Sequence, residues 1–229
     1  MIMRIDILTL FPEMFTPLFS SIMGRATKDG KLEINVINIR DFSKDKHKKC
    51  DDYTFGGGPG MLMMPQPIYD AFLSIPDYEN AYKIYVSPKG NLFNQKMSRD
   101  FAKSYEHIII LCGHYEGVDQ RILDLLIDEE ISIGDYVLTG GELPAMVMVD
   151  AISRHINGVL HSEESASIES FENGLLEYPQ YTKPREFMGL SVPDVLISGD
   201  HKKVDQWRLE QAKILTRQRR PDLLNEDEK

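Results

Sequence analysis

The chain has 229 residues, of which 42% are hydrophobic and 27% are charged, and this composition excludes a disordered or fibrous protein. Its formal net charge of −10 argues against broad, non-specific binding to nucleic acid. No apolar run approaches the roughly 20 residues that a membrane span needs. The first residues lack the basic-then-apolar pattern of a secretory signal, so we expect a cytoplasmic protein with reduced thiols at Cys50 and Cys112 and no membrane partner.

Hydrophobic spacing predicts strands and helices that alternate along the first two thirds of the chain. Strands are predicted at 5–11, 32–39, 81–87, 107–111 and 130–138, the third of them broken by Pro88 and Gly90. Helices are predicted at 13–26, 94–105, 118–127 and 143–156. Because the two kinds of element alternate, we expect an α/β fold with a largely parallel sheet flanked by helices.

The pattern changes after Leu160. The segment 161–170 is short, polar and aperiodic, which is typical of a mobile linker. Beyond it the chain is punctuated by prolines and then predicts one helix at about 201–219. We therefore predict a catalytic α/β domain at 1–160, a linker at 161–170 and a small helical C-terminal domain at 171–229.

Three clusters of glycine mark a candidate ligand site. They lie at 56–60, at 113–117 directly after a predicted buried strand, and at 134–141 before the apolar helix. Loops at the carboxyl ends of parallel strands bind ligands in open α/β sheets, and glycine lets the backbone approach the ligand closely. Tight turns that need glycine are the simpler explanation of any one cluster, but three clusters favour a ligand site.

Common nucleotide and metal motifs are absent from the sequence. No Gly-x-Gly-x-x-Gly follows a strand, and the one Gly-Lys pair, Gly30-Lys31, is followed by leucine rather than by serine or threonine. The six histidines and two cysteines show no metal-ligand spacing, so we expect no bound structural metal.

Basic residues gather in two places on this acidic chain. One cluster consists of Lys44, Lys46, Lys48 and Lys49 around His47; the other consists of Lys202, Lys203, Arg208, Lys213, Arg217, Arg219 and Arg220. Charge alone favours two solvated faces. The alternative is a set of local contacts with phosphate groups.

Taken together, the motifs resemble those of the bacterial tRNA (guanine-N1)-methyltransferases, members of the knotted SPOUT-type methyltransferase superfamily. The resemblance runs from Ile5 to Leu224. It rests on the segments 10–15, 51–64, 112–117, 133–144 and 179–184, and on Trp207-Arg208 with 219–224. Thr54 departs from the family pattern, because many relatives have proline two residues before the three consecutive glycines.

The resemblance implies a deep trefoil knot, which general rules of chain topology would reject. It also implies that S-adenosyl-L-methionine binds at the knot. The residues that match the family's donor site are Tyr85, Val86, Ser87, Pro88, Gly113, Glu116, Gly117, Ile133, Gly134, Asp135, Tyr136, Val137, Leu138, Gly140, Gly141 and Pro144.

The implied activity is transfer of the methyl group to N1 of the guanosine immediately 3′ of the anticodon, at tRNA position 37. N1 carries a proton, so the reaction needs a base, and a cation should stabilise the charge that grows on O6. The family's catalytic arginine matches Arg154, and its aspartate matches Glu169, one methylene longer. Because of this departure, the role of base could pass instead to Glu164 or Glu172.

The resemblance further implies a homodimer whose active sites are shared between subunits, with tRNA as partner. We expect the linker 161–170 to order when tRNA binds, and the residues do not decide whether Mg²⁺ takes part. Two alternatives stay open: a related knotted methyltransferase acting on another RNA site, and a non-catalytic RNA-binding protein. The segment 179–224 favours the tRNA enzymes over the first alternative, and the complete set of donor-site motifs argues against the second.

Overall fold

The computed structural model describes residues 2–160 and 169–224, and the chain divides into two compact units, Met1–His161 and Ser162–Lys229. The predicted linker lies almost wholly outside the described residues, so its predicted mobility and the domain boundaries at 160 and 170 stay predictions. None of the described helices is long and apolar enough to cross a membrane.

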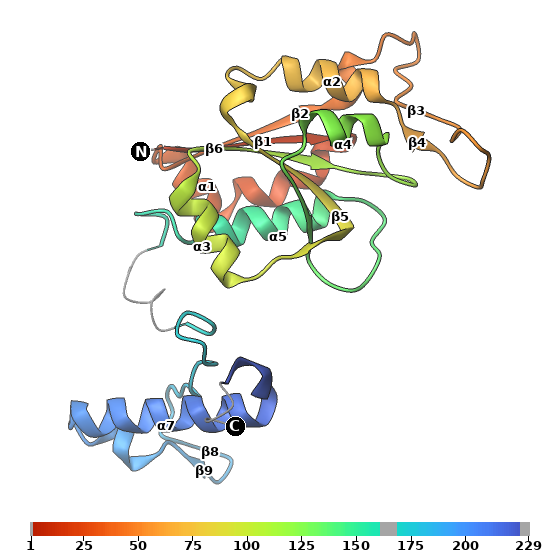
Figure 1. Ribbon diagram of the computed structural model, residues 1–229. Helices are drawn as coiled ribbons and strands as arrows, with labels where there is room; N and C mark the ends of the chain where they lie inside the picture. Colours follow the sequence, from red (N-terminus) through yellow and green to blue (C-terminus); the bar gives the residue numbers. More distant parts are fainter. Residues whose placement is uncertain (1, 161–168, 225–229) are drawn as a thin grey trace. The chain divides into compact units, whose positions relative to one another are not determined.

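The first unit is built on a five-stranded sheet in the order β2-β1-β6-β5-β7, in which every neighbouring pair is parallel (Figure 1). Its strands are β1 (Met3–Thr9), β2 (Leu32–Asn38), β5 (Tyr82–Leu92), β6 (His107–Cys112) and β7 (Glu129–Ser132). Two further short strands, β3 (Asp51–Asp52) and β4 (Leu62–Met63), form a separate antiparallel pair. The prediction of a parallel α/β sheet is confirmed.

Helices cover both faces of this sheet. The α-helices of the first unit are α1 (Ser21–Lys28), α2 (Pro65–Leu73), α3 (Gln95–Ser104), α4 (Gln120–Leu126) and α5 (Glu142–Ser153). The 3₁₀ helices are η1 (Pro12–Phe19), η2 (Ile39–Phe42) and η3 (Tyr78–Asn80). In Figure 1, α1, α3 and α5 lie below the sheet, and α2 and α4 lie above it.

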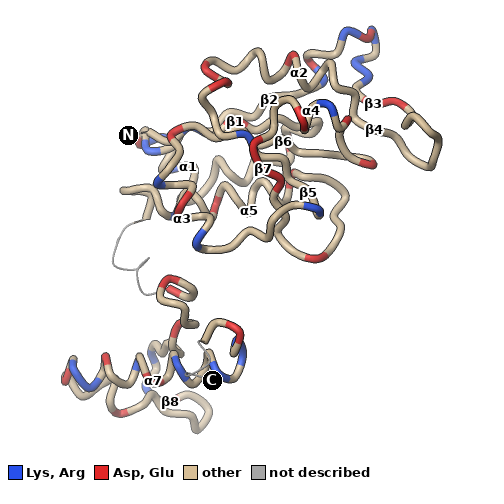
Figure 2. Tube along the Cα trace, viewed as in Figure 1, with Lys and Arg blue, Asp and Glu red and all other residues tan. Residues whose placement is uncertain are grey.

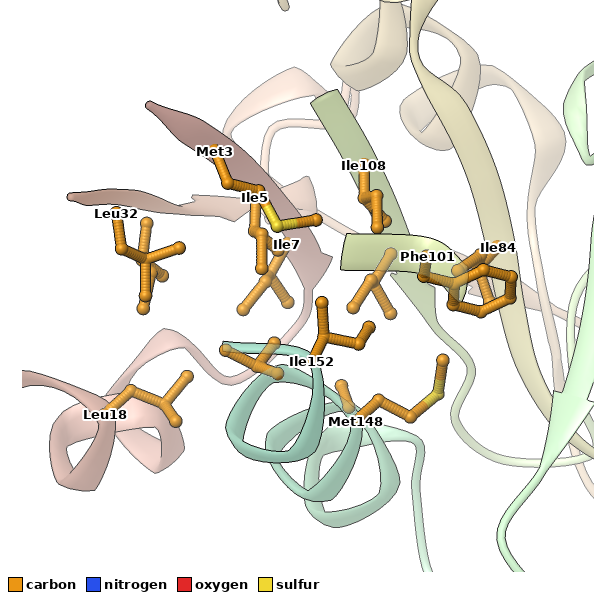
Figure 3. Packing of buried hydrophobic residues seen from close by; sticks show 14 of the residues in the cluster. Met3, Ile5, Ile7, Leu18, Leu32, Ile84, Phe101, Ile108, Met148 and Ile152 are labelled. Carbon is orange, nitrogen blue, oxygen red and sulfur yellow. The ribbon is translucent and has the colours of Figure 1, made fainter. Parts of the chain in front are cut away.

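The two faces have separate hydrophobic cores because successive side chains of a strand point to opposite sides. Ile108 and Ile110 of β6 join the core beside α5, whereas Ile109 joins the core beside α2 and α4, and all three are fully buried. Figure 3 shows Met148 and Ile152 of α5 turned toward the sheet residues of the first core. The uninterrupted apolar run of β6 is therefore explained by burial on both faces.

Pro17 explains why the predicted helix 13–26 is wrong as one continuous element. The segment forms η1, then breaks at Ser20, and only then becomes α1. Proline lacks the N–H for the helical ladder and disfavours helical backbone in the residue before it.

Strand β5 passes through Pro88 and Gly90, contrary to the prediction that these residues end it. Val86 and Asn91 both pair with Ile131 of β7, so residues 87–90 bulge out of the ladder. A Cβ on Gly90 would lie 2.3 Å from the Ile131 nitrogen, so β7 can approach only a glycine here. The bulge keeps proline out of the ladder, where its missing N–H would cost a hydrogen bond.

Two other parts of the first unit also differ from prediction. The extended segment predicted at 130–138 is a strand only as far as Ser132, and the rest leaves the sheet as a loop. Helix α2 was not predicted, although Pro65 at its first position is a common helix start.

The second unit is organised around α7 (His201–Arg219), which matches the predicted helix 201–219. Its other elements are β8 (Glu186–Phe187), β9 (Leu190–Ser191), η4 (Asp194–Ile197) and η5 (Pro221–Leu223). The Thr216 hydroxyl, fully buried, accepts a hydrogen bond from the Leu176 N–H at 2.9 Å and donates one to the Ala212 carbonyl at 2.7 Å. The bond from Leu176 ties the irregular segment before α7 to the helix.

Candidate active site

The loops that follow β5, β6 and β7 enclose a cavity of about 440 Å³. Because these strands are parallel, their carboxyl ends lie at one edge of the sheet, where open α/β sheets bind ligands. The volume is within the roughly 300–1,000 Å³ of small-molecule sites. The fold thus supplies the kind of site that the glycine clusters predicted.

The structure brings together at this cavity nearly all of the residues predicted to bind the donor. Those that line it are Tyr85, Val86, Ser87, Pro88, Gly113, Glu116, Gly117, Ile133, Gly134, Tyr136, Val137, Leu138, Gly140, Gly141 and Pro144. Asp135 does not line it. The contact of any of these residues with a methyl donor stays a prediction.

Sequence reasoning missed other lining residues, among them Leu62, Lys89, His114, Tyr115 and Thr139. His114 and Tyr115 stand between Gly113 and Glu116, so their place in a glycine-bounded loop was the available signal. Leu62 comes from the glycine-rich segment 51–64, whose proximity only the folded chain reveals.

Glycine is required where two of the loops meet. The Gly141 N–H donates a hydrogen bond of 2.8 Å to the Gly113 carbonyl. A Cβ on Gly141 would lie 2.8 Å from the Cα of Cys112, and one on Gly113 would lie 2.6 Å from the Tyr85 hydroxyl. No larger residue fits either position without moving the wall of the cavity.

The glycine cluster at 56–60 is attached to the same site by backbone hydrogen bonds of the residues that follow it. The Glu116 N–H donates to the Met61 carbonyl at 3.0 Å, and the Met63 N–H donates to the Gly117 carbonyl at 2.9 Å. A Cβ on Gly60 would collide with the Glu116 side chain. The segment 51–64 is therefore built against the loop after β6, although it follows none of the three strands.

Two groups in or next to the cavity wall, Tyr85 and Cys112, have raised pKa values. Burial raises the pKa of the Tyr85 hydroxyl to about 12, so this group keeps its proton at neutral pH. Burial, assisted by the nearby Glu142 carboxylate, raises the pKa of the Cys112 thiol well above its ordinary value. Both cysteines are free and buried, as expected, and Cys112 is a packing residue rather than a nucleophile.

The two predicted catalytic residues belong to different units. Arg154 is half-buried and caps the C-terminus of α5, where its N–H donates to the Asp150 carbonyl at 3.2 Å. Glu169 is half-buried in the second unit and lines a smaller cavity of about 260 Å³, together with Tyr178 and Arg208. The Arg208 guanidinium lies over the Tyr178 ring at 5.1 Å.

The two basic clusters lie on exposed segments, one in each unit. Figure 2 shows the first on the loop between η2 and β3, and the second along α7, where acidic positions are interspersed. In the first cluster, Lys44, Lys48 and Lys49 each form an ion pair with an aspartate. Among residues 2–160 and 169–224, no three His, Cys, Asp or Glu side chains are arranged to hold a metal ion.

A parallel α/β sheet with a glycine-lined cavity at its carboxyl edge defines a small-molecule-binding enzyme domain. A sequence model of the family described as tRNA (Guanine-1)-methyltransferase TrmD matches residues 3–226. The chain therefore belongs to the tRNA (guanine-1)-methyltransferase family, and the protein is a methyltransferase.

Individual relatives match over almost their full length. A protein of Ruminiclostridium cellulolyticum named tRNA (guanine-N(1)-)-methyltransferase is 57% identical over 226 residues, which cover 97% of each chain. A protein of Clostridioides difficile with the same name is 56% identical over 225 residues, covering 96% of this chain and 97% of the relative.

Membership of this family implies S-adenosylmethionine as the methyl donor, and the cavity suits such a molecule. Its lining combines several glycines with apolar side chains such as Leu138 and Pro144. Backbone amides and carbonyls can read the edge of an adenine, and apolar side chains can cover its ring. A Cβ on Gly113 would collide with Tyr85, and one on Gly141 with Cys112, so the cavity wall keeps its shape only with glycine at both positions.

Proposed function

We propose that this protein transfers a methyl group from S-adenosyl-L-methionine to N1 of the guanosine at tRNA position 37, immediately 3′ of the anticodon. The observation that carries the proposal is the family match over residues 3–226, together with relatives of the same named activity that cover nearly the whole chain. The glycine-lined cavity at the carboxyl edge supplies a site for the donor. We place the reaction in the cytoplasm.

The donor supplies a methyl group already activated on a sulfonium, so the chain's own task concerns the acceptor. In our proposal Glu169 removes the N1 proton, and Arg154 stabilises the negative charge that develops on O6. Binding and orientation of the base beside the donor supply a further large part of the rate enhancement. Glu172 remains the alternative base among the described residues, and Glu164 is the alternative outside them.

We further propose a homodimer in which Arg154 of one subunit works with Glu169 of the other. The separation of the two residues into different units of one chain is compatible with this arrangement. Exposed apolar residues of α5 support an interface at that helix: Leu143 is 48% and Val147 is 49% exposed.

The deep trefoil knot is also part of the proposal. It is supported by the close contacts among its expected loops, which include the antiparallel bridge between His114 and Gly140 and the bond from Gly141 to Gly113. A crystal structure in which the chain threads through none of its own loops would contradict the knot.

The test is methyl transfer from labelled S-adenosylmethionine to tRNA transcripts that carry guanosine or adenosine at position 37. We expect label only in the guanosine transcript and, after digestion, only in 1-methylguanosine. Label in another nucleoside, or in both transcripts equally, would overturn the proposed site of methylation. A control protein with Arg154→Ala should bind the donor but transfer little label.

A further inference from the structure

A buried polar cluster lies directly behind the cavity wall. The Glu142 side chain is 2% exposed, and one of its carboxylate oxygens accepts a hydrogen bond of 2.8 Å from the Thr9 hydroxyl. The Thr9 oxygen in turn accepts a bond of 2.9 Å from the Phe11 N–H. This chain of bonds fixes the carboxylate at the first turn of α5, where the helix dipole favours a negative charge.

His114 connects this cluster to the cavity. It lines the cavity with its side chain 22% exposed, and its ring packs against Phe11 at 4.8 Å and Tyr115 at 4.9 Å. The ring nitrogen Nδ1 is buried and has no hydrogen-bond partner among the described residues. The exposed part of the side chain therefore lies on its other atoms, which include Nε2.

Nδ1 faces the second oxygen of Glu142 across 3.9 Å. Gly140 leaves this gap open, because a Cβ there would lie 2.3 Å from the Glu142 oxygen and 2.6 Å from Nδ1. Buried polar groups without a partner are rare and are often found where function requires them. A shift of about 1 Å would bring the two atoms to ordinary hydrogen-bond distance.

The carboxylate dictates which nitrogen of His114 carries the proton. A carboxylate oxygen only accepts hydrogen bonds, so it favours the tautomer with the proton on Nδ1. In that tautomer Nε2 is the acceptor of the ring. A carboxylate that orients a histidine in this way is a recurring device in metal sites and catalytic triads.

We propose that His114 reads the target base by accepting a hydrogen bond from the exocyclic 2-amino group of guanine, and that Glu142 positions it for this role. The inference rests on the proposed function. Guanine presents three groups along its pairing edge: the O6 acceptor, the N1–H donor and the 2-amino donor. In our proposal Arg154 of the partner subunit and Glu169 serve the first two, because the Arg154 of the same chain lies at the far end of α5, about 18 Å from Glu142. The third group needs an acceptor that carries no positive charge beside a sulfonium.

The test replaces guanosine at position 37 of the transcript by inosine, which lacks only the 2-amino group. For the unaltered protein we expect kcat/KM to fall by roughly tenfold, the effect of one lost hydrogen bond of about 1.4 kcal/mol. His114→Asn keeps an amide near Nδ1 but has no atom at Nε2, so it should treat the two transcripts alike, within about twofold.

Two further variants separate the roles within the cluster. His114→Gln can place an oxygen near Nε2 and should keep part of the preference for guanosine. Glu142→Gln keeps the bond from Thr9 but can turn an N–H toward Nδ1, which reverses the tautomer, so the preference should be lost. Thermal unfolding, unchanged in all three variants, shows that the fold is retained. Calorimetric donor binding, measured in parallel, separates a lost preference for guanosine from a weakened donor site.

If His114→Asn keeps the full preference for guanosine over inosine, the assignment of His114 is overturned while the proposed function stands. The assignment is also overturned if the unaltered protein methylates the guanosine and inosine transcripts equally well. If the unaltered protein methylates no guanosine transcript at all, the proposed function fails, and the role of His114 fails with it.

Discussion

Glu169 is the residue that we propose as the base, at a position where the resemblance to the family implies an aspartate. If Glu169 removes the N1 proton, Glu169→Gln should lower the single-turnover rate by about 10²–10⁴, the usual effect of losing a positioned acid–base group. Donor and tRNA binding, measured by calorimetry, should stay nearly unchanged. A full rate in this variant would move the role to Glu164 or Glu172.

The same position tests how the site has adapted to the longer side chain. Glu169→Asp restores the family residue but shortens its reach, and catalytic geometry tolerates only about 0.5 Å of misplacement. A slower aspartate variant means that the backbone has adapted to glutamate. Equal rates mean that the segment absorbs one methylene without loss.

Gly141 has an ordinary helical backbone, with φ of −81°, so the reason for glycine there is space rather than strain. In Gly141→Ala the new methyl group would meet the Cys112 backbone, which cannot move aside. We expect donor affinity to fall by about 10- to 100-fold, from an overpacking cost of roughly 1–3 kcal/mol. Gly189→Ala is the control: it strains a backbone with φ of +81° in the second unit, outside the cavity lining, and should leave donor binding unchanged.

At the scale of the element, α7 combines a buried side with exposed cations. Ala212 and Thr216 are buried, whereas Lys213, Arg217 and Arg219 are exposed. We propose that these three side chains contact tRNA phosphates. The triple alanine variant should bind tRNA more weakly, with a salt dependence flatter by up to about 2–3 in the slope of log K against log salt. An unchanged slope in filter-binding titrations would identify a merely solvated face.

At the scale of the whole molecule, α5 has an apolar side that the chain leaves incompletely covered, which we propose as the dimer interface. It buries Met148 and Ile152 against the sheet while Leu143 and Val147 stay about half exposed. Sedimentation of the unaltered protein at micromolar concentration should give a dimer. Val147→Glu should give monomers that lose methyl transfer, because an active site shared between subunits cannot then form. A monomeric and fully active protein would contradict both the interface and the shared site.

The sequence by itself determined the elements whose signals are local. Apolar periodicity placed β2, β6, α3 and α7 closely, and the alternation of strands with helices predicted the parallel sheet. Asn94 and Asp200 cap the N-termini of α3 and α7 with their own side chains. The local sequence therefore also sets where these two helices begin. The glycine clusters predicted that the carboxyl edge of the sheet would carry a ligand site.

Only the tertiary structure decided which segments distant in the sequence contact one another. Nothing near Pro88 in the sequence indicates that Ile131 pairs on both sides of a bulge and lets β5 continue. Nothing near His114 indicates that Glu142, held by Thr9 from the first strand, lies behind its ring. Periodicity reports which side chains are buried within one element, whereas contacts between distant segments depend on the order in which the strands assemble into the sheet. The residues of the site were therefore visible in the sequence, but the partners that position them became visible only in the folded chain.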